Sequence, residues 1–122
     1  KWVAAFLDHW HPDMIVWMES ELWPNMLYEI RHRHIHCTLV NARMSLRSFD
    51  RWQRAKGVLR NLLVTFDMIL AQTPDDAARF NALGAIDVRV RENIKYAALP
   101  LPVDDHDLNT LKSALGLRPR WV

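Results

Sequence analysis

Apolar residues recur along the chain in two alternating patterns, one with the period of a helix and one in short runs. Val3, Phe6 and Leu7 start the first helical pattern, and Pro12 ends it. Residues 13–18 then form a short, mostly apolar run, which is typical of a strand buried on both faces of a parallel sheet. The first part of the chain therefore predicts a helix followed by a strand.

The same alternation predicts the elements of the rest of the chain. Helical spacing indicates helices over residues 23–30, 59–66, 73–83 and about 105–115, and strand-like runs lie at 37–40, 67–71 and 86–90. Thr73 is the expected cap of its helix, and Gly84 is expected to close that helix in a left-handed conformation. The long basic stretch before residue 59 is expected to break at Gly57. The last helix is expected to turn its leucines, Leu108, Leu111 and Leu115, inward.

Strands that alternate with helices of this length require parallel crossovers. The pattern therefore predicts the α/β class: a Rossmann-like open parallel sheet with helices on both faces, in which the strand at 86–90 lies nearer an edge. A length of 122 residues supports one such domain. The chain begins at Lys1, and its last residues, 118–122, resemble the start of another strand, so we expect a piece of a longer protein.

Composition excludes several classes of protein. Half of the residues are apolar, which argues against disorder, and no apolar run approaches the 18 residues of a membrane span. The three glycines, Gly57, Gly84 and Gly116, are isolated, so a glycine-rich phosphate loop is excluded. One cysteine, Cys37, excludes an internal disulfide, and with no activating partner in sight we expect an inert core thiol.

The charge is concentrated in residues 31–60, where eight basic residues face the single acid Asp50. Such a field attracts phosphates of nucleic acid, anionic lipid or nucleotide, although a solvated helix face would have the same composition. Phe49 and Trp52 interleave with arginines, as they would on a surface that stacks single-stranded nucleic acid. The alternative is that both rings pack beneath the helix. One hypothesis is therefore a non-catalytic α/β module whose basic face binds nucleic acid or another anionic partner.

The six histidines suggest a metal site, but their context argues against one. His32 and His36 have the i, i+4 spacing of a helical zinc pair. The helix is expected to end before His36, however, and the intervening arginine would repel a dication. We therefore predict no metal ligands.

Polar residues follow every predicted strand, at the edge where open parallel sheets bind ligands. They are Glu19, Ser20 and Glu21 after the first strand, Asn41, Arg43 and Ser45 after the second, Gln72 and Thr73 after the third, and Glu92, Asn93 and Lys95 after the fourth. Glu19 is either a partner of a helix dipole or an active-site carboxylate.

Four ordered motifs resemble those of the 3-deoxy-D-manno-octulosonic acid (Kdo) transferases, which are lipid A glycosyltransferases. Residues 18–25, MESELWPN, match the E-[ST]-E-L-W-P-N motif, and residues 41–48, NARMSLRS, match N-A-R-x-S-x-R-S. Residues 71–85 contain the elements A-Q, D-A-x-R-F and L-G-A, and residues 93–96, NIKY, lie where the family has [NS]-L-K-[FY]. One departure is Glu92, where the family usually has glycine.

The resemblance implies a two-domain GT-B enzyme that moves Kdo from CMP-Kdo to a lipid A precursor at the cytoplasmic face of the bacterial inner membrane. Residues 1–117 would be part of the N-terminal, acceptor-side domain, and 118–122 the start of the connection to a C-terminal domain that binds the donor. Glu19 and Lys95 align with transition-state stabilisers. The family's general base, a glutamate, would lie upstream of this chain, so the chain alone is expected to be inactive.

The resemblance also implies the other site residues and the partners. The substrate-binding residues would be Glu21, Asn41, Arg43, Ser45, Arg47, Gln72 and Asn93. The arginines suit the phosphates of the acceptor, and the basic stretch also suits a membrane surface. No cofactor, metal or nucleic acid is expected.

Overall fold

The computed structural model of the chain describes residues 1–94 and 102–116. Its strands are β1 (Met14–Met18), β2 (His36–Ala42), β3 (Met68–Ala71) and β4 (Val88–Val90). Its helices are α1 (Trp2–Trp10), α2 (Pro24–His32), α3 (Leu46–Arg54), α4 (Lys56–Leu63), α5 (Pro74–Ala82) and α6 (Asp105–Leu115). Lys95 and residues 118–122, for which the sequence predicts functional and connecting roles, lie outside the described residues.

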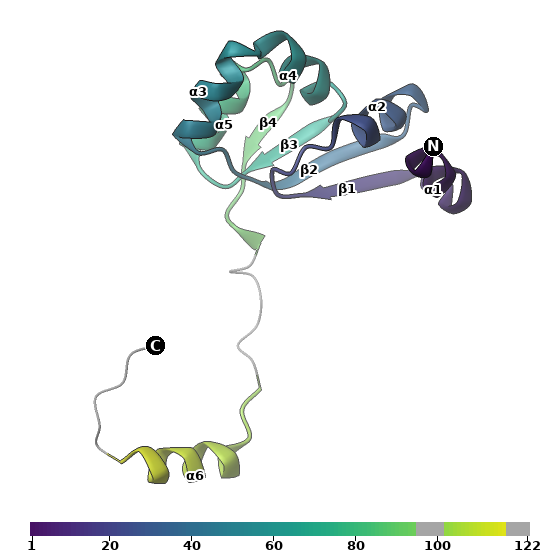
Figure 1. The fold of residues 1–122 in the computed structure, drawn as a ribbon. Coiled ribbons are helices and arrows are strands. Elements are labelled where there is room, and N and C mark those ends of the chain that lie inside the picture. Colours follow the sequence, from purple (N-terminus) through teal and green to yellow (C-terminus); the bar gives the residue numbers. More distant parts are fainter. Residues whose placement is uncertain (95–101, 117–122) are drawn as a thin grey trace.

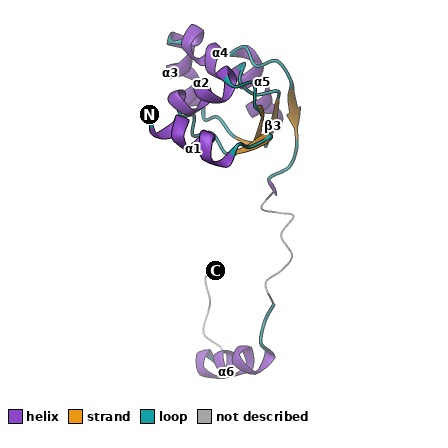
Figure 2. Ribbon diagram, turned by 90° about the vertical axis from the view of Figure 1, so that its right-hand side faces the viewer, coloured by secondary structure: helices purple, strands orange, loops and turns teal. Residues whose placement is uncertain are grey.

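The strands form one parallel sheet in the order β1-β2-β3-β4, so each strand lies beside its successor in the chain (Figure 1). The predicted α/β class and parallel crossovers are confirmed, and β4 is an edge strand as predicted. Each connection in this sheet steps to the next neighbour in the same direction, and right-handed crossovers of this kind place their helices on the same face of the sheet. Figure 2 shows α1 to α4 together on one side of the strands.

The core lies between this helical layer and one face of the sheet. Alternate residues of the strands, such as Cys37, Leu39 and Ile69, contribute to it. The helices contribute Leu27, Ile30, Leu59, Leu63 and Phe80; Leu83 joins them from just after α5, and Phe66 from the turn before β3. A single contiguous cluster is what a two-layer α/β unit of this size is expected to form.

The opposite face of the sheet carries no helix in the described part of the chain. Met14, Val16 and Met18 of β1 are 61%, 54% and 46% exposed. The prediction that residues 13–18 are buried on both faces is therefore wrong, because one face of β1 is uncovered and only Ile15 and Trp17 of this strand pack against the core. The expected helices on both faces are seen on one face only.

Two further expectations need correction. The break in the basic stretch lies at Ala55, between α3 and α4, and Gly57 lies inside α4. In α6, Leu111 and Leu115 are 56% and 38% exposed, and no residue of this helix is buried. The inward orientation predicted for the leucines is therefore wrong for the described structure.

Helix ends follow the local sequence signals more closely. The Thr73 hydroxyl accepts a hydrogen bond from the Asp76 backbone N–H (3.1 Å), and Pro74 occupies the first turn of α5. Gly84, with φ 98°, follows α5 in a conformation that side chains rarely adopt. Arg33, which follows α2, contacts Asp8 of α1 at 2.5 Å and Glu29 of α2 at 3.3 Å, and its hydrogen bond lowers the pKa of Asp8.

Candidate functional site

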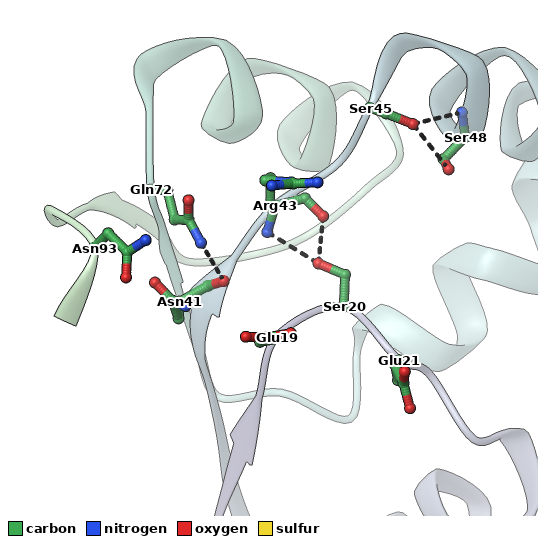
Figure 3. Close-up of a pocket in the computed structure, with 9 residues that line it drawn as sticks. All are labelled: Glu19, Ser20, Glu21, Asn41, Arg43, Ser45, Ser48, Gln72 and Asn93. Atoms are coloured by element: carbon green, nitrogen blue, oxygen red, sulfur yellow. Dashed lines mark hydrogen bonds between the residues drawn. The ribbon is translucent and has the colours of Figure 1, made fainter. Parts of the chain in front are cut away.

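A pocket of about 390 Å³ lies at the carboxyl ends of the strands, where the loops after β1, β2, β3 and β4 meet (Figure 3). In a parallel sheet these ends share one edge, so short polar segments far apart in sequence are brought together. The pocket is lined by Glu19, Ser20, Glu21, Asn41, Arg43, Ser45, Ser48, Gln72 and Asn93. All of these side chains are polar, which suits a hydrophilic ligand.

The structure brings together seven of the nine residues that the sequence suggested for the site. Glu19, Glu21, Asn41, Arg43, Ser45, Gln72 and Asn93 line the pocket. Arg47, in the first turn of α3, does not; it lines a separate depression with Asp50, Arg51 and Arg54. Lys95 falls outside the described residues. Ser20 and Ser48 also line the pocket, and both lie within the motifs that carried the resemblance.

Ser20 ties the loop after β1 to the loop after β2. Its hydroxyl accepts a hydrogen bond from the Arg43 backbone N–H (2.9 Å) and donates one to the Arg43 carbonyl oxygen. These two bonds continue the β1–β2 pairing by one step past the end of the sheet. Ser20 therefore positions the Arg43 backbone, a role that residue type alone does not reveal.

The amino end of α3 forms another wall of the pocket. Ser45 is the helix cap: its hydroxyl oxygen accepts a hydrogen bond from the Ser48 N–H (3.2 Å), and its hydroxyl donates to the Ser48 hydroxyl (3.1 Å). The free backbone N–H groups and positive dipole end of such a helix favour anions nearby. With Arg43 beside it, this wall is electropositive.

A buried carboxylate fixes the loop that leads into α3. Asp76 is 3% exposed, and its carboxylate accepts hydrogen bonds from the Met44 N–H (2.7 Å) and the Thr73 hydroxyl (2.6 Å). Arg79 donates to the Met44 carbonyl oxygen (2.8 Å) and lies 3.4 Å from Asp76. Met44 lies 32 residues from Asp76 in the sequence, so the local sequence around Asp76 does not reveal this contact.

Two pocket residues have a left-handed backbone although neither is glycine. Glu19 has φ 62° directly after β1, and Asn41 has φ 56° near the end of β2. For a residue with a side chain this conformation costs about 1–2 kcal/mol, less for asparagine, and it persists where the surroundings enforce it. The Glu19 N–H donates to the Val40 carbonyl oxygen (3.0 Å), which ties the two residues to the same step of the sheet.

The carboxamide of Asn41 is buried without a hydrogen-bond partner. The residue is 3% exposed, and neither Nδ2 nor Oδ1 has a partner among the described residues. A buried polar atom left unpaired costs about 1–3 kcal/mol, so such groups are uncommon in native structures. The backbone of Asn41 is satisfied, since Gln72 Nε2 donates to its carbonyl oxygen (3.1 Å), as Figure 3 shows.

The pocket therefore combines three kinds of chemistry. Glu19 and Glu21 supply carboxylates that can stabilise developing positive charge or orient a donor. Arg43 and the amino end of α3 supply positive charge for an anionic group. The side chains of Asn41, Gln72 and Asn93 supply carboxamides, which pair with hydroxyl groups.

The histidines do not form a metal site in the described part of the chain. No group of three or more His, Cys, Asp or Glu residues there could hold a metal ion. His32 is the last residue of α2 and His36 the first of β2, so their helical spacing is not realised. His36 Nδ1 instead lies 3.0 Å from the Asp67 carboxylate.

Cys37 is buried, as predicted for a core thiol. Burial, with a smaller effect from the Asp67 charge, raises the pKa of this thiol to about 12. A buried, protonated thiol is a poor nucleophile, which agrees with the inert core thiol that the sequence predicts.

The two rings that suggested a nucleic-acid surface face the interior. Phe49 and Trp52 are partly buried and pack against the core beneath α3. The arginines of this helix point the other way, around the depression that Arg47, Arg51 and Arg54 line with Asp50. The surface is therefore cationic but lacks the stacking platform of a single-strand binder.

No helix in the described ranges, 1–94 and 102–116, is long and apolar enough to cross a membrane.

Glu92 is not among the residues with positive φ. The glutamate is therefore compatible with the backbone at this position.

Comparison with known proteins agrees with the motifs in this pocket. The family model described as "3-Deoxy-D-manno-octulosonic-acid transferase (kdotransferase)" matches residues 1–98. A 3-deoxy-D-manno-octulosonic acid transferase of Rickettsia bellii is 37% identical over 90% of this chain and 26% of its own length. The transferase of the same name from Haemophilus influenzae is 31% identical over 98% of this chain and 29% of its own length.

A plant protein is similar over the same segment. The probable mitochondrial 3-deoxy-D-manno-octulosonic acid transferase of Arabidopsis thaliana is 39% identical over 98% of this chain and 28% of its own length. The chain thus spans about a quarter of the length of the relatives it matches.

Proposed function

The chain belongs to the 3-deoxy-D-manno-octulosonic acid (Kdo) transferase family, and from this premise we propose that it is the acceptor-side part of a Kdo transferase. The complete protein would move Kdo from CMP-Kdo to a lipid A precursor in lipopolysaccharide synthesis. The observation that supports this most strongly is the convergence of the four motif segments. Residues after β1, β2, β3 and β4 line one polar pocket with both carboxylates and a cationic wall.

Glu19 and Lys95 would stabilise the transition state. As the bond between Kdo and CMP breaks, positive charge develops on the sugar and negative charge on the departing nucleotide. A carboxylate such as Glu19 favours the first, and an ammonium such as Lys95 offsets the second. The left-handed backbone of Glu19 fixes the origin of its side chain at the sheet edge, which suits a group that must not reorganise during the reaction.

The cationic wall would hold the phosphates of the acceptor. Arg43 lies in the pocket next to the amino end of α3, and Arg47, Arg51 and Arg54 continue the positive charge along that helix. Guanidinium groups bind phosphate in a bidentate manner. The outer arginines would also contact the anionic surface of the inner membrane, at whose cytoplasmic face the acceptor is presented.

The remaining parts of the machinery would come from elsewhere in the complete protein. Residues 1–117 would form part of the acceptor-side domain, residues 118–122 would begin the connection to the donor-binding domain, and the general base would be a glutamate upstream of Lys1. We therefore expect the 122-residue chain alone to transfer no Kdo. Turnover by this chain would contradict that division of roles.

The test is an assay of the complete protein with CMP-Kdo and a lipid A precursor. We expect Glu19→Ala and Lys95→Ala each to lower kcat by about 100-fold or more, since each removes charge stabilisation of the transition state. Lys112→Ala on α6, an exposed lysine outside the pocket, is the matched control and should keep the parental rate. Near-parental turnover in both Glu19→Ala and Lys95→Ala would contradict the assignment of these two residues.

A further inference from the structure

The carboxamide of Asn41 differs from its polar neighbours in the pocket, because it is buried and unpaired. Its Nδ2 and Oδ1 have no hydrogen-bond partner among the described residues. Nearby, Ser20 bonds to both backbone groups of Arg43, and the Gln72 amide donates to the Asn41 carbonyl oxygen. Buried polar groups in proteins are nearly always hydrogen-bonded. The unpaired amide of Asn41 therefore points to a hydrogen-bond partner outside the chain.

The sheet holds this amide rigidly. The pairing of β2 with β3 is irregular between Leu39 and Ala42, and Asn41 lies in that irregularity with φ 56°. Backbone bonds hold both sides of it: the Glu19 N–H donates to Val40 O (3.0 Å), and the Gln72 N–H donates to Ala42 O (2.9 Å). A bulge of this kind redirects a side chain, here toward the pocket that Asn41 lines.

The chemistry of a carboxamide selects the kind of group that can satisfy it. Nδ2 donates and Oδ1 accepts, so a complementary ligand must accept and donate at adjacent positions. Phosphate diesters and carboxylates only accept at neutral pH, and they would leave Oδ1 unpaired. A carbohydrate hydroxyl, or two neighbouring hydroxyls, supplies both functions.

We propose that Asn41 determines specificity by pairing its carboxamide with a non-reacting sugar hydroxyl of the substrate, a role that rests on the proposed transferase function. The pocket would then be divided: the Asn41 side receives the neutral part of a sugar, while Arg43 and the amino end of α3 receive an anionic group. Because both amide atoms are covered in the structure, a side chain of the pocket wall moves aside when the sugar enters.

The test compares variants of the complete protein in which the side-chain amide of Asn41 is removed or changed while the backbone conformation is kept. Asn41→Gly removes the side chain and accepts φ 56° without strain, so the pocket geometry is kept. Asn41→Asp keeps the size of the side chain and its tolerance of this backbone, but it exchanges the donor for a second acceptor. We expect Asn41→Gly to keep a melting temperature within about 3 °C of the parent, while Asn41→Asp, which buries a carboxylate, melts lower; kcat/KM should be lower by about 30-fold or more in both variants.

The decisive measurement uses substrates from which one non-reacting hydroxyl has been removed in turn, on CMP-Kdo in one arm and on the acceptor disaccharide in the other. We expect one such deoxy substrate to cost the parent about 30-fold or more in kcat/KM, and to cost Asn41→Gly less than about 3-fold, since the amide that would be left unpaired is already gone. The arm in which this occurs identifies the sugar that Asn41 contacts.

The outcomes are distinct. Equal penalties in the parent and in Asn41→Gly for every deoxy substrate, as an amide that only holds a buried water would give, overturn the Asn41 proposal while leaving the transferase function intact. A parental kcat/KM in Asn41→Gly overturns it as well. If the parent transfers no Kdo from CMP-Kdo to the intact acceptor, the proposed function itself is overturned, and the assignment to a sugar hydroxyl fails with it.

Discussion

At the scale of single residues, the pocket depends on a buried carboxylate that does not line it. Asp76 accepts hydrogen bonds from the Met44 N–H and the Thr73 hydroxyl and lies beside Arg79, so one side chain joins the start of α5 to the loop before α3. This arrangement fixes the wall on which Arg43 and Ser45 lie. The stability of the domain and the geometry of the pocket are therefore coupled at this residue.

We expect Asp76→Ala to lower the free energy of unfolding by about 2–4 kcal/mol, because it leaves the Met44 N–H without its acceptor and removes the buried carboxylate beside Arg79. Urea unfolding monitored by circular dichroism measures this. Asp75→Ala is the matched control: Asp75 lies 3.6 Å from the same arginine, but its side chain is 83% exposed, and its loss should cost less than about 0.5 kcal/mol. Equal losses in the two variants would contradict a structural role for the buried carboxylate.

The buried thiol provides a test of pH dependence. Burial raises the pKa of Cys37 from its ordinary value of 9.0 to about 12, so the folded chain retains this proton more strongly than the unfolded chain. The corresponding stability is fully present below pH 9 and is lost as the pH rises toward 12. Near pH 10.5 the loss should be on the order of 1–2 kcal/mol, and the pH profile of Cys37→Ala should lack this component.

The reactivity of the same thiol should follow its burial. At a pH of about 8 we expect iodoacetamide to leave Cys37 unmodified in the native chain and to alkylate it fully in denaturant, as read by mass spectrometry. Rapid alkylation of the native chain would contradict the buried, protonated state.

The sequence predicted which residues share the pocket where the residue type and the order of the strands were sufficient. The rule that parallel strands bind ligands at their carboxyl ends was sufficient to group Glu19, Asn41 and Gln72, which share one pocket in the structure. The left-handed backbone of Asn41 and its unpaired amide could not be predicted, because both arise from the irregular pairing of β2 with β3. The functional roles of Glu19 and Lys95 remain predictions.

At the scale of helices, the ends were predictable where a residue acts locally. Thr73 caps α5 and Gly84 follows its end, because a hydroxyl and a residue tolerant of positive φ act through the nearest backbone. The break between α3 and α4 was predicted at Gly57 but lies at Ala55. Alanine carries no turn signal, so this break follows from the packing of Trp52 and Leu59 against the core.

Gly84 and Gly57 should therefore respond to alanine in opposite directions. Gly84→Ala places a methyl group at φ 98° and 3.0 Å from Arg60 Cγ; the arginine side chain can move, but the backbone strain remains and should cost about 1–2 kcal/mol. Gly57 lies within α4, and a methyl group added there would meet no other atom within 4 Å, so Gly57→Ala should raise stability by about 0.5–1 kcal/mol. Thermal and urea unfolding of the two variants supply the comparison, and effects of the same sign would contradict this account.

At the scale of the whole molecule, the sequence predicted the order of strands and helices but not which faces of the sheet are covered. An apolar run such as residues 13–18 has the same appearance in a central strand and in an edge strand with one exposed face. The strand order decides which face of the sheet the helices cover. When each strand lies beside its successor and the crossovers are right-handed, all the connecting helices lie on one face. The result is an apolar surface on β1 formed by Met14, Val16 and Met18.

This surface, together with the unpaired edge of β1, should make the 122-residue chain self-associate, because an open strand edge beside exposed apolar side chains is a template for another chain. Sedimentation velocity over a range of concentrations should show a reversible shift to larger species, and Val16→Lys should move that shift to at least about 10-fold higher concentration by placing a charge on the surface. Val58→Lys is the matched control: Val58 is 60% exposed and Val16 is 54% exposed, but Val58 lies on α4, in the layer of helices on the opposite face of the sheet. Association that both lysine variants weaken equally would locate it elsewhere, and a monomer at every concentration would show that β1 is protected in spite of its exposure.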